Sequence, residues 1–149
     1  MNEARLQQKV RALLRELGDE HPHRDLAAGV PDLSFTIWPT WEPEPLSGWL
    51  ELKWSPAPAH LTTPINLRGR GRWTANQRLW LQRRGAAGGT CCLGLAVGQT
   101  FYLIWWAIAL DRFADGQRAT HVDIVDLELI AAYHGALAHL TATNLSHAL

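Results

Sequence analysis

Apolar residues recur at intervals of three and four near both ends of the chain, a spacing that predicts amphipathic helices. The first helix is expected from Glu3 to Leu17, with Gly18 ending it and with Glu3 on its apolar stripe. That stripe consists of Leu6, Val10, Leu13, Leu14 and Leu17. A last helix is expected over residues 126–140, capped by Asp126. Its apolar side consists of Ile130, Tyr133, Leu137 and Leu140.

Two further helices are predicted in the middle of the chain. Thr74-Ala75-Asn76-Gln77 fits a capping box, in which the Gln77 side chain reaches back to the backbone of Thr74. The helix that begins there should run to about Arg84 and end at three glycines, Gly85, Gly88 and Gly89. A short helix is expected over Ala107 to Phe113.

Alternation with a period of two predicts a pair of strands between the first and second helices. The first strand runs from Asp32 to Trp38, and Asp32 stands at its start. The second runs from Trp49 to Trp54, and the side chains on one of its faces are Trp49, Glu51 and Lys53. The connection from Pro39 to Ser47 contains three prolines and should form a loop. The strands should therefore return antiparallel, which brings Asp32 close to Glu51.

The order of elements predicts a single domain of the α/β class, with a mixed sheet flanked by helices. A second pair of strands is expected at Cys91 to Val97 and Thr100 to Trp106, joined by a turn at Gly98-Gln99. A chain of 149 residues with 47% hydrophobic content suits one domain with its own core. We find no internal repeat and no second-domain boundary.

Neither a membrane partner nor secretion is expected. No apolar run is long enough to span a bilayer, and the segment from Met1 to Leu17 is too polar for a secretion signal. Cys91 and Cys92 are adjacent in a predicted strand, so their side chains point to opposite faces and cannot form an ordinary disulfide. These features favour a cytoplasmic protein.

Charge is balanced overall but unevenly distributed. Fourteen basic and fourteen acidic residues cancel, yet the segment from Trp54 to Leu110 contains six arginines and neither Asp nor Glu. This segregation predicts a locally positive surface suited to phosphates, although an ordinary solvated face is the alternative from charge alone. The candidate DNA contacts are Arg68, Arg70, Arg72 and Arg78. Trp73, beside them, is the candidate for stacking on an unpaired base.

Asp32, Glu51 and Lys53 form a candidate catalytic group. Carboxylate oxygens suit Mg²⁺ or Mn²⁺, and a lysine beside them supplies a fixed positive charge. Structural alternatives exist for each residue: Glu51 and Lys53 could be an ion pair on an exposed sheet, and Asp32 could serve turn chemistry after a proline. Gln77 could act only as a capping residue, and Glu3 only as a solvated first-turn acid.

The motifs together resemble a known superfamily. Gly29-Val30-Pro31-Asp32, then Gly48-Trp49-Leu50-Glu51-Leu52-Lys53, then Thr74 with Gln77 and Trp80, resemble small phage-type nucleases of the PD-(D/E)XK superfamily, notably its VRR-NUC-like branch. The core is also similar to that of archaeal Holliday junction resolvases. The likeness covers roughly residues 3–106 and implies a restriction-endonuclease-like fold.

The resemblance implies a role for each matching residue. Asp32 and Glu51 would be metal ligands together with the backbone carbonyl of Leu52. Lys53 would position or activate the attacking water. Glu3 would be the helix-borne acid and Gln77 an accessory residue.

The expected function is a Mg²⁺- or Mn²⁺-dependent DNA endonuclease, with selectivity for particular DNA structures left open, in the cytoplasm of a bacterial or phage-infected cell. Two alternatives remain. One is a DNA-binding or protein-interaction module on the same scaffold without turnover. The other is a Holliday junction resolvase, which requires a symmetric homodimer.

Overall fold

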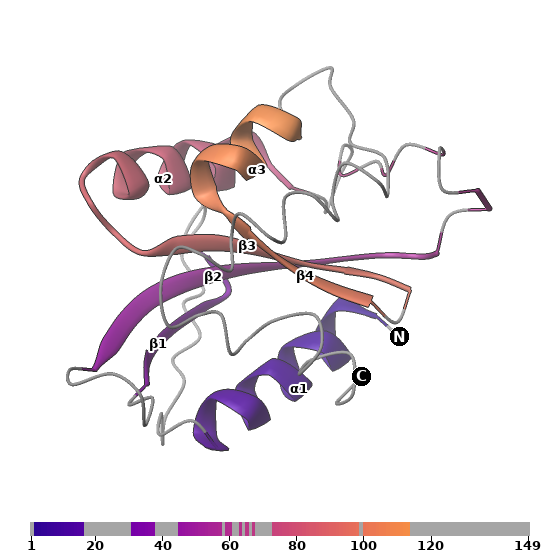
Figure 1. Cartoon of the computed structure of the whole chain (residues 1–149), viewed down its shortest axis with the longest axis horizontal. Coiled ribbons are helices and arrows are strands. Elements are labelled where there is room, and N and C mark those ends of the chain that lie inside the picture. Colours follow the sequence, from indigo (N-terminus) through magenta and orange to yellow (C-terminus); the bar gives the residue numbers. More distant parts are fainter. Residues whose placement is uncertain are drawn as a thin grey trace.

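The computed structural model describes residues 2–16, 31–37, 45–57, 59–60, 63, 65, 67, 73–98 and 100–113 (Figure 1). The described helices are α1 (Glu3–Glu16), α2 (Ala75–Ala86) and α3 (Trp106–Arg112). The described strands are β1 (Leu33–Ile37), β2 (Leu46–Ser55), β3 (Cys91–Val97) and β4 (Thr100–Trp105). The helix predicted over residues 126–140 lies outside this part of the chain.

The four strands form one mixed sheet in the order β1-β2-β3-β4. β1 pairs with β2 antiparallel and β3 pairs with β4 antiparallel, as the sequence predicted, while β2 and β3 run parallel. Parallel neighbours need a crossover connection, and α2 lies in the segment that provides it. The prediction of an α/β fold with a mixed sheet is therefore confirmed.

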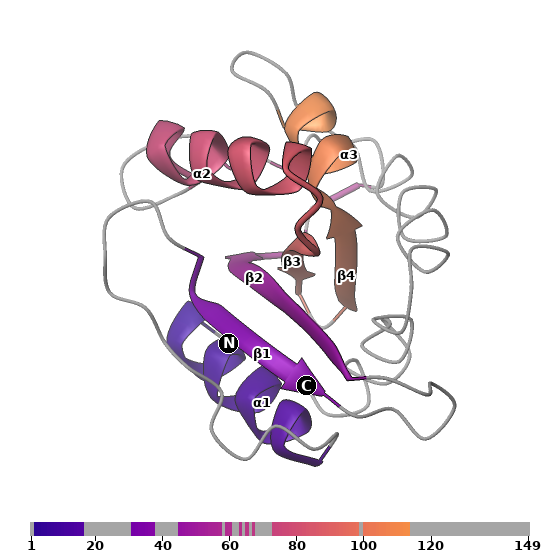
Figure 2. The ribbon, with the colours of Figure 1, turned by 90° about the vertical axis from the view of Figure 1, so that its left-hand side faces the viewer.

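Helices cover both faces of the sheet. α1 lies on one face, and α2 and α3 lie on the other (Figures 1 and 2). The core on the α1 side is built around Leu6, Val10 and Leu14 from the helix and Leu33, Phe35, Leu50 and Leu52 from the strands. The core on the opposite side includes Leu81, Leu93, Leu95, Tyr102 and Ile104. Period-two alternation along the strands supplies side chains to both layers.

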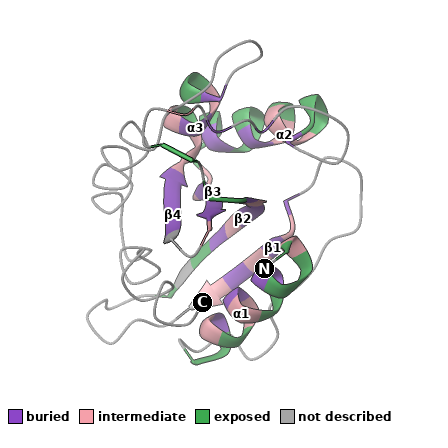
Figure 3. Cartoon of the chain, turned by 90° about the vertical axis from the view of Figure 1, so that its right-hand side faces the viewer, coloured by how far each residue is buried: buried purple, intermediate pink, exposed green. Residues whose placement is uncertain are grey.

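β3 is the most completely enclosed strand, since all seven of its residues are buried. Burial is concentrated in the strands, while the outer surfaces of the helices are exposed (Figure 3). No described helix combines the length and the hydropathy needed to cross a bilayer. Cys91 and Cys92 are free and buried, and burial raises the pKa of the Cys91 thiol to about 11, so both remain inert core residues.

Several element boundaries differ from the sequence prediction. β2 begins at Leu46 and not after Gly48, because Leu46 and Ser47 still pair with β1. Gly48 lies within the strand where a Cβ would stand 2.7 Å from the Thr90 carbonyl oxygen, so the glycine permits close approach of a neighbouring backbone.

The end of α2 also lies beyond its predicted position. The helix continues through Gly85 to Ala86 and does not stop at the first glycine. Gly85 is buried against the Trp106 ring, and a Cβ there would overlap atoms of that ring. Its lack of a side chain therefore allows α2 and α3 to pack closely instead of ending the helix. α3 starts at Trp106, one residue before its predicted start.

Candidate active site

The candidate site forms where β1 begins and one edge of β2 is left without a strand neighbour. The last residue pair between these strands is Leu33 with Leu50. Trp49 donates its N–H toward the β3 side, so the N–H groups of Leu50 and Leu52 point toward β1. Leu52 lies beyond the ladder, and its N–H donates to Oδ2 of Asp32 at 2.8 Å. The Asp32 carboxylate thus replaces the missing strand partner.

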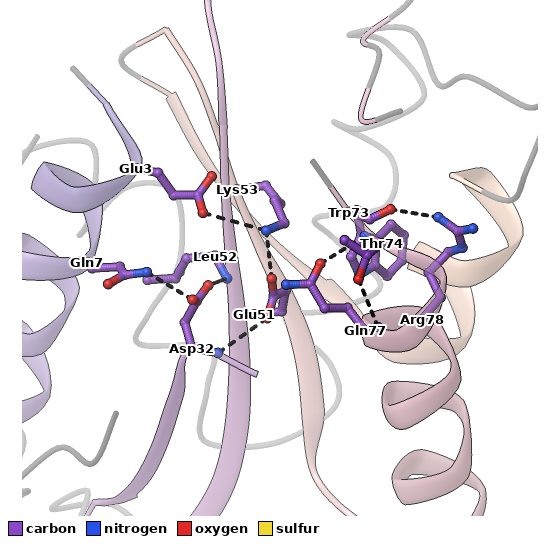
Figure 4. A network of polar contacts seen from close by, with 10 residues as sticks. All are labelled: Glu3, Gln7, Asp32, Glu51, Leu52, Lys53, Trp73, Thr74, Gln77 and Arg78. Carbon is purple, nitrogen blue, oxygen red and sulfur yellow. Dashed lines mark hydrogen bonds and ion pairs between the residues drawn. The ribbon is translucent and has the colours of Figure 1, made fainter. Parts of the chain in front are cut away.

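A second donor fixes the other oxygen of Asp32. Gln7 of α1 donates from Nε2 to Oδ1 of Asp32 at 2.9 Å (Figure 4). The Asp32 backbone N–H lies 3.3 Å from Oε2 of Glu51, to which it donates. Gln7 is only 8% exposed and was not predicted as a site residue. Its sequence signal is weak: a polar residue on the apolar side of the first helix, one turn after Glu3.

Glu51 and Lys53 meet as a buried ion pair. Their side chains project from the same face of β2, and the Lys53 ammonium nitrogen lies 2.7 Å from Oε1 of Glu51. Glu51 is 1% and Lys53 3% exposed. The alternative of an ion pair on an exposed sheet is therefore wrong, because both residues are enclosed by the fold.

Glu3 joins this group from the first turn of α1. One of its carboxylate oxygens lies 3.6 Å from the Lys53 ammonium nitrogen, and its side chain is 38% exposed. Glu3, Glu51 and Lys53 thus lie together, in agreement with the sequence prediction (Figure 4). The partly exposed Glu3 marks the side from which the buried pair is nearest to solvent.

The charges at the site perturb one another. The pKa of Glu51 is raised to about 7, chiefly by burial and then by the neighbouring Asp32 charge, while the Lys53 ammonium opposes both effects. Burial lowers the pKa of Lys53, but the surrounding carboxylates, Glu51 first, outweigh burial and raise it overall. Lys53 is therefore a permanent positive charge at neutral pH, whereas Glu51 titrates near neutrality in the absence of a metal.

Gln77 lies on the α2 side of the candidate site (Figure 4). Thr74 and Gln77 form the predicted capping box: the Gln77 N–H donates to Oγ1 of Thr74 at 3.2 Å, and the Thr74 N–H donates to Oε1 of Gln77 at 2.9 Å. With its oxygen held by the cap, the Gln77 side chain directs its amide nitrogen toward Glu51 (Figure 4). Capping and proximity to the site are thus combined in one residue.

Two of the five predicted DNA contacts, Trp73 and Arg78, lie in the described part of the chain. The stacking role predicted for Trp73 is wrong, because its ring is only 2% exposed and packs edge-on against Phe113 in the core. Arg78 is partly buried and donates from Nη1 to the Trp73 carbonyl at 2.7 Å, so it fastens the start of α2. Arg68, Arg70 and Arg72 lie outside the described residues.

The donor set suits a hard divalent cation, with the backbone as a necessary contributor. Among the described residues, no three His, Cys, Asp or Glu side chains form a group that could hold a metal without other ligands. Two carboxylates are present, and the Leu52 carbonyl points to the same strand edge as its N–H. Oε1 of Glu51 is buried, and its near partner within the described structure is the Lys53 ammonium at 2.7 Å, so a second lone pair of this oxygen remains for a cation.

Comparison of the chain with protein families, curated proteins and solved structures found no match.

Proposed function

We propose that this protein is a metal-dependent nuclease that hydrolyses phosphodiester bonds of DNA. The observation that carries the proposal is the convergence of Asp32, Glu51 and Lys53 at the open edge of β2. Two carboxyl groups and an ammonium group held together at this strand edge combine cation binding with stabilisation of a developing negative charge.

Asp32, Glu51 and the Leu52 carbonyl would hold the cation, Mg²⁺ or Mn²⁺. A bound cation of this kind would supply Lewis-acid polarisation of the phosphodiester and a lowered pKa for a water molecule. The protein prepares the ligands in advance, since both oxygens of Asp32 already accept hydrogen bonds from fixed donors, Gln7 and Leu52. Each carboxylate oxygen has a second lone pair that remains for coordination.

Lys53 contributes positive charge beside the reacting phosphate. Its ammonium is held between Glu51 and Glu3, and the attraction of these carboxylates keeps it protonated. A preorganised charge in a water-poor site stabilises the negative charge that develops as the phosphate is attacked. The same ammonium can orient a water molecule for in-line attack, because it has three N–H donors.

The architecture supports an assignment to the PD-(D/E)XK superfamily and its restriction-endonuclease-like fold. The acid–x–lysine motif lies on a strand paired antiparallel with the strand that follows Pro31-Asp32, and helices flank both faces of the sheet. Fold alone does not specify chemistry, so the argument for hydrolysis depends on the site. DNA as the substrate belongs to the same proposal, and a cytoplasmic location is proposed from the adjacent free cysteines, Cys91 and Cys92.

A cleavage assay with plasmid, linear duplex, single-stranded and branched DNA tests the proposal. We expect cleavage with Mg²⁺ or Mn²⁺, none with chelator, and none by the Asp32→Asn variant, which keeps the side-chain shape. Asp111→Asn is the matched control, because the Asp111 side chain is 75% exposed and pairs only weakly with Arg112 at 3.8 Å. No cleavage of any substrate by the wild-type protein would reject the proposed function.

A second candidate function is a DNA-binding module that does not turn over. It is favoured by one observation: the Lys53 ammonium lies 2.7 Å from Glu51, so the buried carboxylate has a counter-charge without a cation. Calorimetric titration with Mn²⁺ separates the two functions. Uptake that Asp32→Asn abolishes supports the nuclease, whereas no uptake by the wild-type protein supports the module.

A further inference from the structure

A cluster of Trp49, Trp80 and Arg84 lies beside the candidate site. The two tryptophan rings meet edge-to-face, with centroids 5.7 Å apart and an interplanar angle of 61°. The Arg84 guanidinium carbon lies 4.2 Å from the Trp49 ring centroid and 5.9 Å from that of Trp80. Arg84 is exposed, so its charge is presented at the surface while the rings hold it in place.

This arrangement leaves the hydrogen-bonding edge of Arg84 available. A guanidinium stacked on a ring uses its flat face, and its N–H donors lie in the plane and point outward. Within the described part of the chain, Arg84 forms no ion pair with a carboxylate. The sequence around it, from Trp54 to Leu110, contains no Asp or Glu. A planar donor edge of this kind matches the two oxygens of a phosphate.

The cluster is adjacent to the candidate catalytic row. Trp49, Glu51 and Lys53 follow one another on the same face of β2, so Trp49 stands about 7 Å along the strand from Glu51. α2 spans the same interval, since Gln77 lies near Glu51 and Arg84 lies over Trp49. A group bound at Arg84 would therefore lie next to one bound at the carboxylates.

Polar side chains continue this face across β1. Ser34 is the register partner of Trp49, and residues directly opposite in an antiparallel pair share a face. Further along, the hydroxyls of Thr36 and Ser47 hydrogen-bond to each other at 2.8 Å in an exposed position. From Asp32 to Thr36 the face beside Arg84 thus carries a carboxylate followed by hydroxyl groups, which suits contact with a sugar-phosphate backbone.

We propose that Arg84, held by Trp49 and Trp80, binds a backbone phosphate of the DNA strand next to the bond positioned at Asp32 and Glu51. The assignment of DNA as the ligand rests on the proposed function. Arg84 would fix the register of the strand, since phosphate contacts position a nucleic acid without reading its sequence. The competing interpretation is that the stack only stabilises the packing of α2 on β2.

The test is DNA binding by the full chain with chelator present, so that no cleavage occurs. A fluorescein-labelled single-stranded oligonucleotide and the corresponding duplex are titrated with wild type, Arg84→Gln and Arg83→Gln. Arg83 is the matched control, because it is a neighbouring exposed arginine on the same helix that contacts no aromatic ring among the described residues. We expect Arg84→Gln to raise Kd about tenfold and Arg83→Gln less than threefold. The slope of log K against log salt concentration should fall by about one for Arg84→Gln.

Equal weakening by the two variants, or unchanged binding by Arg84→Gln, would overturn the inference. If Arg84→Gln does not fold, Arg84→Lys keeps the charge without the planar donor edge and should still raise Kd about threefold. Binding that depends on Arg84 without cleavage in Mg²⁺ would reject the nuclease and retain this site. Cleavage with binding insensitive to Arg84 would reject this site and retain the nuclease.

Discussion

β2 and β3 are neighbouring strands that contribute different side chains to the same layer of the core. In their parallel register Glu51 pairs with Leu93, and Lys53 pairs with Leu95. All four residues lie on the same side of the sheet, and all four are buried. β3 contributes two leucines to this layer, whereas β2 contributes a carboxyl group and an ammonium group.

The difference shows that packing alone does not require the charges. Leucine fits this layer of the sheet, as β3 demonstrates, and a buried ion pair seldom stabilises a fold more than apolar residues of similar volume would. Removing two charges from water costs free energy that their mutual attraction only partly offsets. The contrast with β3 therefore supports the functional role that we propose for Glu51 and Lys53, and the following variants test that role.

The largest effect is expected from converting Lys53 to an apolar residue. Lys53→Met keeps the unbranched side chain and removes the charge, so the rate of DNA cleavage should fall about 10³-fold. Single-turnover cleavage at saturating Mg²⁺ measures the loss. Lys9→Met on α1 is the control and should cleave normally. A rate within threefold of wild type for Lys53→Met would show that the charge has no catalytic part.

A large effect on stability is expected when only one member of the pair is replaced. Glu51→Leu leaves the Lys53 ammonium buried without its nearest partner and should lower the free energy of unfolding by about 3 kcal/mol. Glu51→Leu with Lys53→Leu copies β3 and should return to within about 1 kcal/mol of wild type. Urea denaturation measures both. A double variant as unstable as the single one would mean that the layer cannot accept leucine at β2.

The pH dependence of stability gives a further test of the buried carboxyl group. Because the pKa of Glu51 is raised from 4.5 to about 7, the folded state keeps a proton that the unfolded chain has lost between these pH values. Stability of the metal-free protein should therefore fall as pH rises through this window, by up to about 1.4 kcal/mol per pH unit. Glu51→Gln should lack this component, and identical pH profiles for the two proteins would contradict it.

The smallest effect is expected at Gln7, which reaches the site from the apolar side of α1. Gln7→Leu removes the donor to Asp32, and the leucine suits the surrounding core, so folding should persist. The Mg²⁺ concentration needed for half-maximal cleavage should rise about tenfold. Gln8→Leu, an exposed neighbour, is the control. An unchanged Mg²⁺ dependence would assign Gln7 to packing alone.

Local patterns were sufficient to predict much of the fold and the site. Period-two alternation predicted the first antiparallel pair and placed Glu51 and Lys53 on one face with Asp32 nearby, and the turn at Gly98-Gln99 predicted the second pair. The capping box at Thr74 depends on residues only three positions apart, which is why it could be recognised. Predictions succeeded where the decisive interaction is close in sequence.

The failures involve partners distant in sequence. Gln7 is polar on an apolar stripe, and its role depends on Asp32, 25 residues later. The position of Trp73 beside the arginines predicts stacking on a base, but the residue is buried and its ring packs edge-on against Phe113, 40 residues later. Gly85 was interpreted as a helix stop because the Trp106 ring that fills the space beside it could not be foreseen. Each outcome is decided by tertiary contact and not by local propensity.

The hydrogen bond from the Leu52 amide to the Asp32 carboxylate can be observed in solution through the exchange of its proton. The Leu52 amide proton exchanges with solvent only when its hydrogen bond to the Asp32 carboxylate is broken, so its rate of deuterium uptake measures how often this contact opens. A ligand that stabilises this hydrogen bond would slow the exchange of the Leu52 amide proton. Assembly of the site could thus be followed by nuclear magnetic resonance without a substrate.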